Sequence, residues 1–132
     1  MRFQTLAVAL LSACLSVAAV PAAHAATEAP FTQAAFAAAQ QGGKPILVHI
    51  TASWCPTCAK QKPILAALEG QPEFKDLIVY QVDFDTQKDV VRAMGAQVQS
   101  TLVVFHGTAE KGRSAGDTNA ESLKALVEKA NS

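Results

Sequence analysis

The sequence predicts an α/β domain in which helices flank a central sheet, and three observations point to this class. Helix-type and strand-type patterns alternate along the chain after residue 30. The run Ile46–Ile50 is almost continuously apolar, as is typical of a strand covered on both faces in a parallel sheet. Glycines follow the helix-type segments, at Gly42-Gly43, Gly70 and Gly95, where they end helices well. The predicted order is helix, strand, helix, strand, helix, strand, strand, helix.

The first 25 residues have the pattern of a secretory signal peptide. Arg2 precedes an apolar run over residues 6–20, which is too short to span a membrane, and an Ala-x-Ala sequence ends at Ala25. We therefore predict cleavage after Ala25 and export to the periplasm of a Gram-negative bacterium. Two alternatives remain. Leu11–Cys14 resembles a bacterial lipobox, which would leave Cys14 as a lipidated N-terminus, or the run stays uncleaved as an anchor.

Cleavage would divide the chain into a signal peptide, residues 1–25, and one folded domain, residues 26–132, close to the usual size of a small domain of about 100 residues. The only cysteines left would be Cys55 and Cys58, so none remains for a separate structural disulfide. The formal net charge is +0, and the sequence has neither a basic patch nor a polybasic run. Composition therefore predicts no nucleic-acid partner and no membrane-surface site.

The domain is predicted to begin with a tail, Thr27–Pro30, followed by an alanine-rich helix over Phe31–Gln41. Phe31 and Phe36 have the spacing of one helical face. We expect this face to pack on the sheet, and a docking face for a partner is the alternative.

The apolar strand Ile46–Ile50 feeds a second helix, predicted over Cys55–Glu69. Pro63 lies inside this helix and should kink it. Apolar residues at helical spacing predict its buried face: Ile64, Leu65 and Leu68.

The next strand is predicted at Leu77–Val82, and Asp83–Asp85 carries it into a loop. Thr86-x-x-Asp89 has the form of a capping box, so we expect a helix to begin there and to continue through Met94.

A β-branched and aromatic strand is predicted at Thr101–Phe105, with a turn at His106-Gly107 and a short edge strand at Arg113–Ala115. Thr118-x-x-Glu121 forms a second capping box, which would open the last helix. Its buried face is predicted to consist of Leu123, Leu126 and Val127.

The sequence Trp54-Cys55-Pro56-Thr57-Cys58 lies where the apolar strand feeds the helix, and a Cys-x-x-Cys at such a point is a redox motif. Cys55 is expected at the helix N-terminus, where free backbone N–H groups and the helix dipole stabilise a thiolate. Cys58 lies one turn later and can close a disulfide. A purely stabilising disulfide is the alternative, but a bridge over so few residues constrains little of the unfolded chain.

These residues resemble the thioredoxin family. The resemblance extends from the strand and the Trp-Cys-x-x-Cys sequence to Pro63, to the strand end at Val82–Asp85, to Thr101–Phe105 and to Gly116 before the last helix. It implies a thioredoxin-like fold, with a central mixed β-sheet flanked by helices. Family members often have a strand ahead of the first helix. Because the sequence shows no good candidate there, we expect a sheet reduced at its N-terminal strand.

The resemblance also implies a protein thiol–disulfide oxidoreductase. Cys55 would attack a partner's disulfide as a thiolate, and Cys58 would resolve the mixed disulfide, while the reverse direction would oxidise a partner. No bound organic cofactor is expected. The expected partners are protein disulfides or dithiols, together with a membrane or periplasmic redox partner that supplies or removes electrons. The protein is expected to be a monomer.

Four further residues of this site are implied by the resemblance. Pro56 and Thr57 help to set the reduction potential, and the Thr57 hydroxyl either donates to a thiolate or faces solvent. Trp54 lines the active-site surface, or it packs in the ordinary way. His49 stands six residues before Cys55, where thioredoxin has a buried acid that assists proton transfer at the second cysteine. A histidine either does the same work, with a pKa nearer neutral pH, or is only hydrogen-bonded within the strand layer.

Ser100 departs from the family, which has a cis-proline just before the residue that corresponds to Thr101. Because a cis peptide before a non-proline residue costs about 3–4 kcal/mol, we expect a trans Gln99–Ser100 bond and a loop of different shape. Such a loop would alter the recognition of peptide substrates, and it could also admit a metal or cluster at the cysteines. A neutral replacement is the alternative.

Two functions from other classes stay open. Two thiolates can hold Cu(I), so a metal-binding or metal-delivery protein would use Cys55 and Cys58, completed by His49 or by a ligand from a partner. An adaptor would use the fold only to bind a partner and would not need Cys55.

Overall fold

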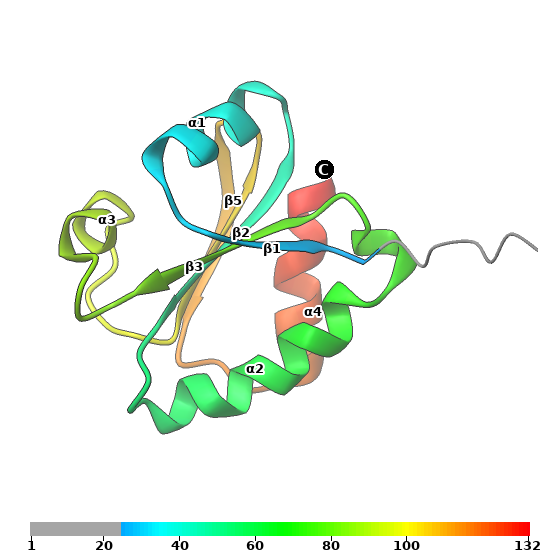
Figure 1. Ribbon diagram of the computed structural model, residues 1–132. Coiled ribbons are helices and arrows are strands. Elements are labelled where there is room, and N and C mark those ends of the chain that lie inside the picture. Colours follow the sequence, from blue (N-terminus) through cyan, green and yellow to red (C-terminus); the bar gives the residue numbers. More distant parts are fainter. Residues whose placement is uncertain (1–24) are drawn as a thin grey trace, which may run out of the picture.

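The structure is a computed structural model that describes residues 25–132 (Figure 1). The predicted signal peptide up to residue 24, and Cys14 with it, lie outside these residues. The described strands are β1 (Thr27–Pro30), β2 (Pro45–Thr51), β3 (Ile78–Asp83), β4 (Thr101–His106) and β5 (Ala109–Ala115). The helices are α1 (Gln33–Gln41), α2 (Pro56–Glu69), α3 (Lys88–Ala93) and α4 (Ala120–Glu128), with 3-10 turns η1 (Pro72–Phe74) and η2 (Lys129–Asn131). None of the helices in residues 25–132 has the length and apolar character needed to cross a bilayer.

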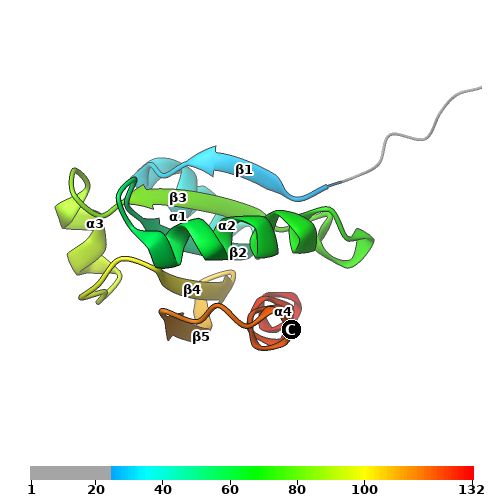
Figure 2. The ribbon, with the colours of Figure 1, turned by 90° about the horizontal axis from the view of Figure 1, so that it is seen from below.

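The strands form one mixed sheet in the order β1-β3-β2-β4-β5, which Figure 2 shows from one edge to the other. β1 and β2 both run parallel to β3, whereas β4 runs antiparallel to β2 and to β5. β2 is central and is buried along Ile46–Ile50, as its apolar sequence predicts. The predicted α/β class and mixed central sheet are confirmed.

The prediction of a tail at Thr27–Pro30, and of a sheet reduced there, is wrong. These residues form β1, which pairs in parallel with β3, and the Thr27 N–H donates to the carbonyl of Leu77 at 2.9 Å. The strand is short, lies at the sheet edge and is largely exposed, so it has no alternation of apolar residues to reveal it. Pro30 is its last residue, where a missing N–H is tolerated at an edge.

Both predicted capping boxes are also wrong. The Thr86 hydroxyl and N–H donate to the carboxylate of Asp83, at 3.0 and 2.8 Å, so Thr86 belongs to a turn and α3 begins at Lys88. These bonds, with one from the Asp85 N–H, hold the pKa of Asp83 below its usual value. α4 is capped one residue later than predicted, by Asn119.

The Asn119 side chain accepts hydrogen bonds from the N–H groups of Glu121 and Ser122, each at 3.0 Å. Asparagine is as good an N-cap as threonine, so the sequence alone left the register of this helix open by one residue. The predicted edge strand at Arg113–Ala115 is longer than expected and spans Ala109–Ala115, with mostly polar, exposed residues.

Each face of the sheet carries its own apolar core. On one face, α1 and α3 pack through Phe36, Val91 and Met94 against alternate residues of the central strands. On the other, α2 and α4 pack through residues such as Leu65, together with the predicted face of the last helix, Leu123, Leu126 and Val127. In β2 the residues Ile46, Val48 and Ile50 belong to the first core and Leu47 to the second. His49 therefore faces the α2 and α4 side.

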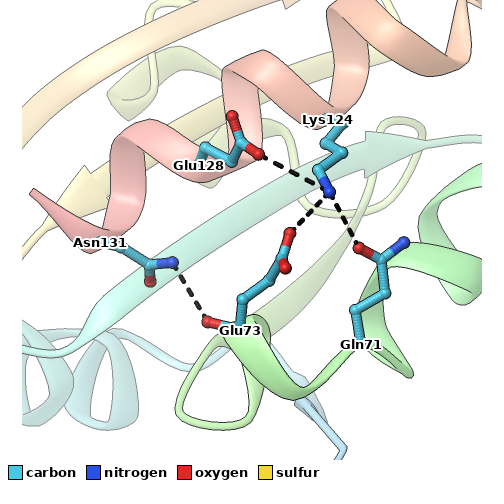
Figure 3. A network of polar contacts seen from close by, with 5 residues as sticks. All are labelled: Gln71, Glu73, Lys124, Glu128 and Asn131. Carbon is cyan, nitrogen blue, oxygen red and sulfur yellow. Dashed lines mark hydrogen bonds and ion pairs between the residues drawn. The ribbon is translucent and has the colours of Figure 1, made fainter.

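A polar network joins α4 to the segment that follows α2 (Figure 3). The Lys124 ammonium lies 2.7 Å from a carboxylate oxygen of Glu73, donates to Gln71 at 3.2 Å and lies 3.8 Å from Glu128. The Asn131 amide donates to the backbone carbonyl of Glu73 at 3.2 Å. Glu73 first, and then Glu128, raise the pKa of Lys124. The network as a whole links α4 and η2 to η1.

Candidate active site

The two cysteines lie where α2 begins, directly after the central strand β2. Cys55 is the N-cap of α2, with extended backbone angles, and its sulfur accepts a hydrogen bond from the Cys58 N–H at 3.0 Å. The two sulfurs form a disulfide, with Cα atoms 5.3 Å apart. Pro56 occupies the first turn, where its missing N–H costs no helical bond. When the disulfide is reduced, the same N–H and the helix N-terminus favour a thiolate at Cys55.

The disulfide is buried on an apolar base but bordered by exposed side chains. Cys55 and Cys58 cluster with Ala52, and Phe84 packs against this cluster. Trp54 is 57% exposed, so its indole is a surface group and does not pack in the core. Its Nε1–H donates to the Asp85 carboxylate at 2.7 Å, which fixes the ring beside the motif. Thr57 is half-buried in the first turn of α2.

Ser100 has a trans peptide bond before it and a left-handed backbone with φ of +62°. Its carbonyl accepts hydrogen bonds from the Gly116 N–H at 3.0 Å and from the Gln61 amide at 3.1 Å. The Thr101 hydroxyl donates to the Val98 carbonyl at 2.8 Å. The expected trans bond before Ser100 is confirmed. The three hydrogen bonds stabilise the loop around Ser100 with this left-handed residue in it.

This loop lies at the same end of the sheet as the cysteines, because the register pairs Thr101 with Ile50, five residues before Cys55. Val98, on the loop, is 47% exposed. Val98 and Trp54 are the large apolar side chains most exposed among residues 25–132. Trp54 and the loop that carries Val98, here called the rim of the site, thus each expose one apolar side chain at this end of the sheet.

His49 is fully buried behind the motif. Its Nε2 lies 3.1 Å from Oε1 of Gln61, which is itself fully buried on α2. Burial disfavours the charged imidazolium and lowers the pKa of His49 below its usual value. Its Nδ1 has no hydrogen-bond partner among the described protein atoms. The surroundings of His49 therefore favour a neutral imidazole whose Nε2 is hydrogen-bonded to Gln61.

Sequence reasoning missed two residues of this site, Gln61 and Asp85. Gln61 had a usable signal, because it lies one turn after Cys58 and on the same helical face as the buried Leu65 and Leu68. A polar residue on a buried stripe must find partners there. Asp85 had no such signal, since its role depends on how the loop after β3 folds back to Trp54.

A cavity of about 460 Å³ lies beside His49, between β1, β2, β3 and α2. Three charged side chains line it, Glu28, Lys62 and Glu69. Burial, and next the charge of Glu28, raise the pKa of Glu69 to about 7. The buried imidazole of His49 and the Glu69 carboxyl, whose pKa is about 7, thus line the same cavity.

Replacement of Glu69 by glutamine should flatten the pH dependence of stability. The unfolded carboxyl releases its proton near pH 4.5 and the folded one near pH 7, so the free energy of unfolding falls as pH rises between these values. Glu69 is partly exposed, and after allowance for solvent screening we expect Glu69→Gln to be more stable than the wild type by about 1 kcal/mol at pH 8. Urea unfolding at pH 4.5 and pH 8 measures this.

Glu121→Gln is the control, because Glu121 is an exposed residue in the first turn of α4. In Glu121→Gln the difference in the free energy of unfolding between pH 4.5 and pH 8 should be the same as in the wild type. If Glu69→Gln also leaves that difference unchanged, the carboxyl of Glu69 titrates at its ordinary pKa.

No group of three or more His, Cys, Asp or Glu side chains in residues 25–132 is placed to hold a metal ion. His106 points elsewhere, since its Nδ1 lies 2.8 Å from the carbonyl of Ala130 in η2. Of the residues predicted for the site, His49 and Ser100 are brought together through Gln61, while Trp54, Pro56 and Thr57 flank the cysteines in sequence.

Comparisons with known proteins agree with this geometry. The sequence profile of the family described as Thioredoxin matches residues 27–129. The chain is 30% identical over 66 residues to Thioredoxin Asp f 29 of Aspergillus fumigatus, a match that covers 50% of this chain and 60% of the fungal one. It is 30% identical over 91 residues to Thioredoxin H4 of Arabidopsis thaliana, covering 69% of this chain and 75% of the plant protein.

A solved structure shows the same fold. The crystal structure of Trxlp from Edwardsiella tarda has 40% sequence identity and a TM-score of 0.73, and the match covers 76% of this chain and 97% of that one. The curated matches are partial, since this chain spans only 60% of the Aspergillus protein. With the family profile over residues 27–129 and the Cys55–Cys58 pair at the start of α2, the chain belongs to the thioredoxin family.

Proposed function

We propose that the protein exchanges disulfides with protein thiols through Cys55 and Cys58. The observation that carries this proposal is the position of Cys55 as the N-cap of α2, with the Cys58 N–H 3.0 Å from its sulfur. That arrangement lowers the pKa of a thiol and places the second sulfur within bonding distance of the first. Membership of a family of thiol–disulfide oxidoreductases supports the same reaction.

The reaction takes two steps of thiol–disulfide exchange. The Cys55 thiolate attacks one sulfur of a partner's disulfide, forms a mixed disulfide and releases the other sulfur as a thiolate. Cys58 then loses its proton and attacks the Cys55 sulfur, which releases the second partner thiolate and leaves the Cys55–Cys58 disulfide. Two electrons pass from the cysteine pair to the partner. The reverse sequence oxidises a partner dithiol.

The substrates are protein disulfides or dithiols that dock on the apolar rim around the motif. Trp54 and Val98 are both exposed there, and an extended partner chain would cover them. Ser100 shapes this rim in place of a proline. His49 acts as the proton acceptor for the Cys58 thiol, supported by its burial on the α2 side of the sheet and by its contact with Gln61, one turn after Cys58. The lowered pKa keeps its imidazole neutral, so that one ring nitrogen has a lone pair for the proton.

We place the protein in the periplasm, as a monomer that exchanges electrons with a membrane or periplasmic redox partner. The basic, apolar and Ala-x-Ala segments that precede residue 26 support export. Ala26, the first residue after the predicted cleavage site, is held in the fold by its N–H, which donates to the carbonyl of Glu69 at 2.9 Å. Mass spectrometry of the protein recovered from cells separates cleavage after Ala25 from lipidation at Cys14.

The reduction potential of the Cys55–Cys58 pair tests the proposed function. The protein is equilibrated with glutathione buffers and followed by Trp54 fluorescence, with the Cys55→Ser, Cys58→Ser double variant as the control that should not respond. A value near about −270 mV assigns a reductant, and a value near about −120 mV assigns a disulfide donor. Metal content is measured on the same sample. Bound metal without any Cys55–Cys58 disulfide would overturn the proposal in favour of metal binding.

A further inference from the structure

Gln61 is a fully buried polar side chain that connects four segments of the chain. From α2, its Oε1 lies 3.1 Å from Nε2 of His49 on β2. Its Nε2 donates to the carbonyl of Ser100, before β4, at 3.1 Å and to the carbonyl of Asp117, before α4, at 2.9 Å. The amide thus meets one ring nitrogen and two backbone oxygens.

These partners fix the orientation of the amide and the tautomer of the histidine. Carbonyl oxygens only accept hydrogen bonds, so the Gln61 NH₂ group must face Ser100 and Asp117. Oε1 is then the atom that faces His49, and because it also only accepts, the His49 Nε2 must carry the proton. In a neutral imidazole the other nitrogen, Nδ1, holds the free lone pair.

We propose that Gln61 is a positioning residue that holds His49 in the Nε2–H tautomer, so that Nδ1 is the atom that accepts the proton of Cys58. This inference rests on the proposed function. Cys58 is fully buried one turn before Gln61 on the same face of α2, which places it on the side of the sheet that His49 faces. In the resolving step the Cys58 S–H bond breaks, its proton passes to Nδ1, and the sulfur keeps the electron pair with which it attacks Cys55. The resulting imidazolium carries N–H groups at both nitrogens and later loses a proton to solvent.

The same amide links the proton acceptor to the loop that replaces the family's proline. Ser100 keeps a second donor for its carbonyl, the Gly116 N–H, so its loop does not depend on Gln61 alone. The Nε2–H of His49 has Gln61 as its acceptor. Loss of the amide should therefore affect His49 more than the loop.

The tautomer is measured directly by long-range ¹⁵N–¹H NMR of the full chain, because the protonated and free nitrogens of a neutral imidazole resonate differently. We expect Nε2–H for His49. His106 is an internal reference for the other tautomer, since its Nδ1 lies 2.8 Å from the Ala130 carbonyl and must carry a proton to donate to it. In Gln61→Met the preference of His49 for the Nε2–H tautomer should be lost. Gln61→Glu keeps an acceptor oxygen, so this variant should retain the Nε2–H tautomer. His106 should not change in either variant.

The kinetic consequence is measured with Ellman's reagent in a stopped-flow instrument. Attack by Cys55 releases one nitrothiobenzoate, and resolution by Cys58 releases the second, so the two steps appear as two phases. We expect His49→Ala and Gln61→Met each to slow the second phase by about 10-fold or more and to leave the first nearly unchanged. Because Gln61 acts through His49, the double variant should be no slower than His49→Ala alone.

Three results would overturn the assignment of Gln61: an Nδ1–H tautomer in the wild type, an unchanged tautomer in Gln61→Met, or rate losses that add in the double variant. The last would indicate a merely structural role. If the tautomers are as expected but neither phase depends on Cys55, the proposed function fails and the placement of His49 by Gln61 stands. If Gln61→Met does not fold, the wild-type spectrum and Gln61→Glu still decide the tautomer.

Discussion

Replacement of Cys55 by serine is expected to reduce disulfide exchange by roughly 1,000-fold or more, since the hydroxyl cannot replace a helix-capping thiolate as a nucleophile. Cys58→Ser is expected to behave differently. It keeps the attacking sulfur but removes the resolving one, so the protein should accumulate as a mixed disulfide with its partner. Reduction of insulin disulfides measures the first effect. Non-reducing electrophoresis measures the second.

The two variants are matched controls for each other, because each keeps one sulfur at the start of α2. The expected asymmetry depends on the Cys58 N–H that bonds the Cys55 sulfur at 3.0 Å. If the mixed disulfide accumulates in Cys55→Ser and not in Cys58→Ser, the roles of the two cysteines are reversed. If a cellular function survives Cys55→Ser at wild-type level, the protein acts as an adaptor.

Phe74→Ala is expected to lower the free energy of unfolding by about 3–5 kcal/mol. Phe74 is fully buried in η1, within the core that α2 and α4 form over the sheet. Truncation leaves a cavity that the surrounding side chains can only partly fill, because they are held by both helices. Urea or thermal unfolding measures the loss, which is a large fraction of the stability of a domain of this size.

Glu73→Gln is the neighbouring control. Glu73 precedes Phe74 in the same turn and forms the ion pair with Lys124 that Figure 3 shows. Both charged side chains are well exposed, so the pair gains little over hydration and the variant should remain close to wild-type stability. A loss in Glu73→Gln as large as that in Phe74→Ala would mean that the polar network, and not the apolar core, holds η1 against α4.

The parts of the fold that could be predicted are those whose burial leaves a pattern in the sequence. β2 is buried on both faces and reads as a continuous apolar run, and α2 is delimited by Pro56 and Gly70. The edge strands behave differently. β1 is held by backbone bonds to β3 with few buried side chains, so nothing in its composition distinguishes it from a tail.

The thiol chemistry of the candidate site could be predicted from the sequence, but the hydrogen bonds between its residues could not. Cys55 and Cys58 are recognisable from spacing and position alone. The Asp85 bond to Trp54 and the Gln61 bonds to His49, Ser100 and Asp117 join residues between 12 and 56 positions apart. The sequence marks Gln61 as a polar residue on a buried helical face, but which partners it meets, and that Asp85 meets Trp54, depends on how distant segments pack together. Which nitrogen of His49 is hydrogen-bonded therefore becomes visible only in the folded structure.

The left-handed backbone at Ser100 has a consequence for how this loop can evolve. Proline holds φ near −65°, whereas the backbone here has φ of +62°. A single mutation to proline would turn the Ser100 carbonyl away from Gln61 and Gly116 before any compensating change had arisen. A change between serine and proline at this position would therefore need other changes in the loop at the same time. Drift at position 100 should accept glycine or asparagine, which tolerate this conformation, long before it returns to proline.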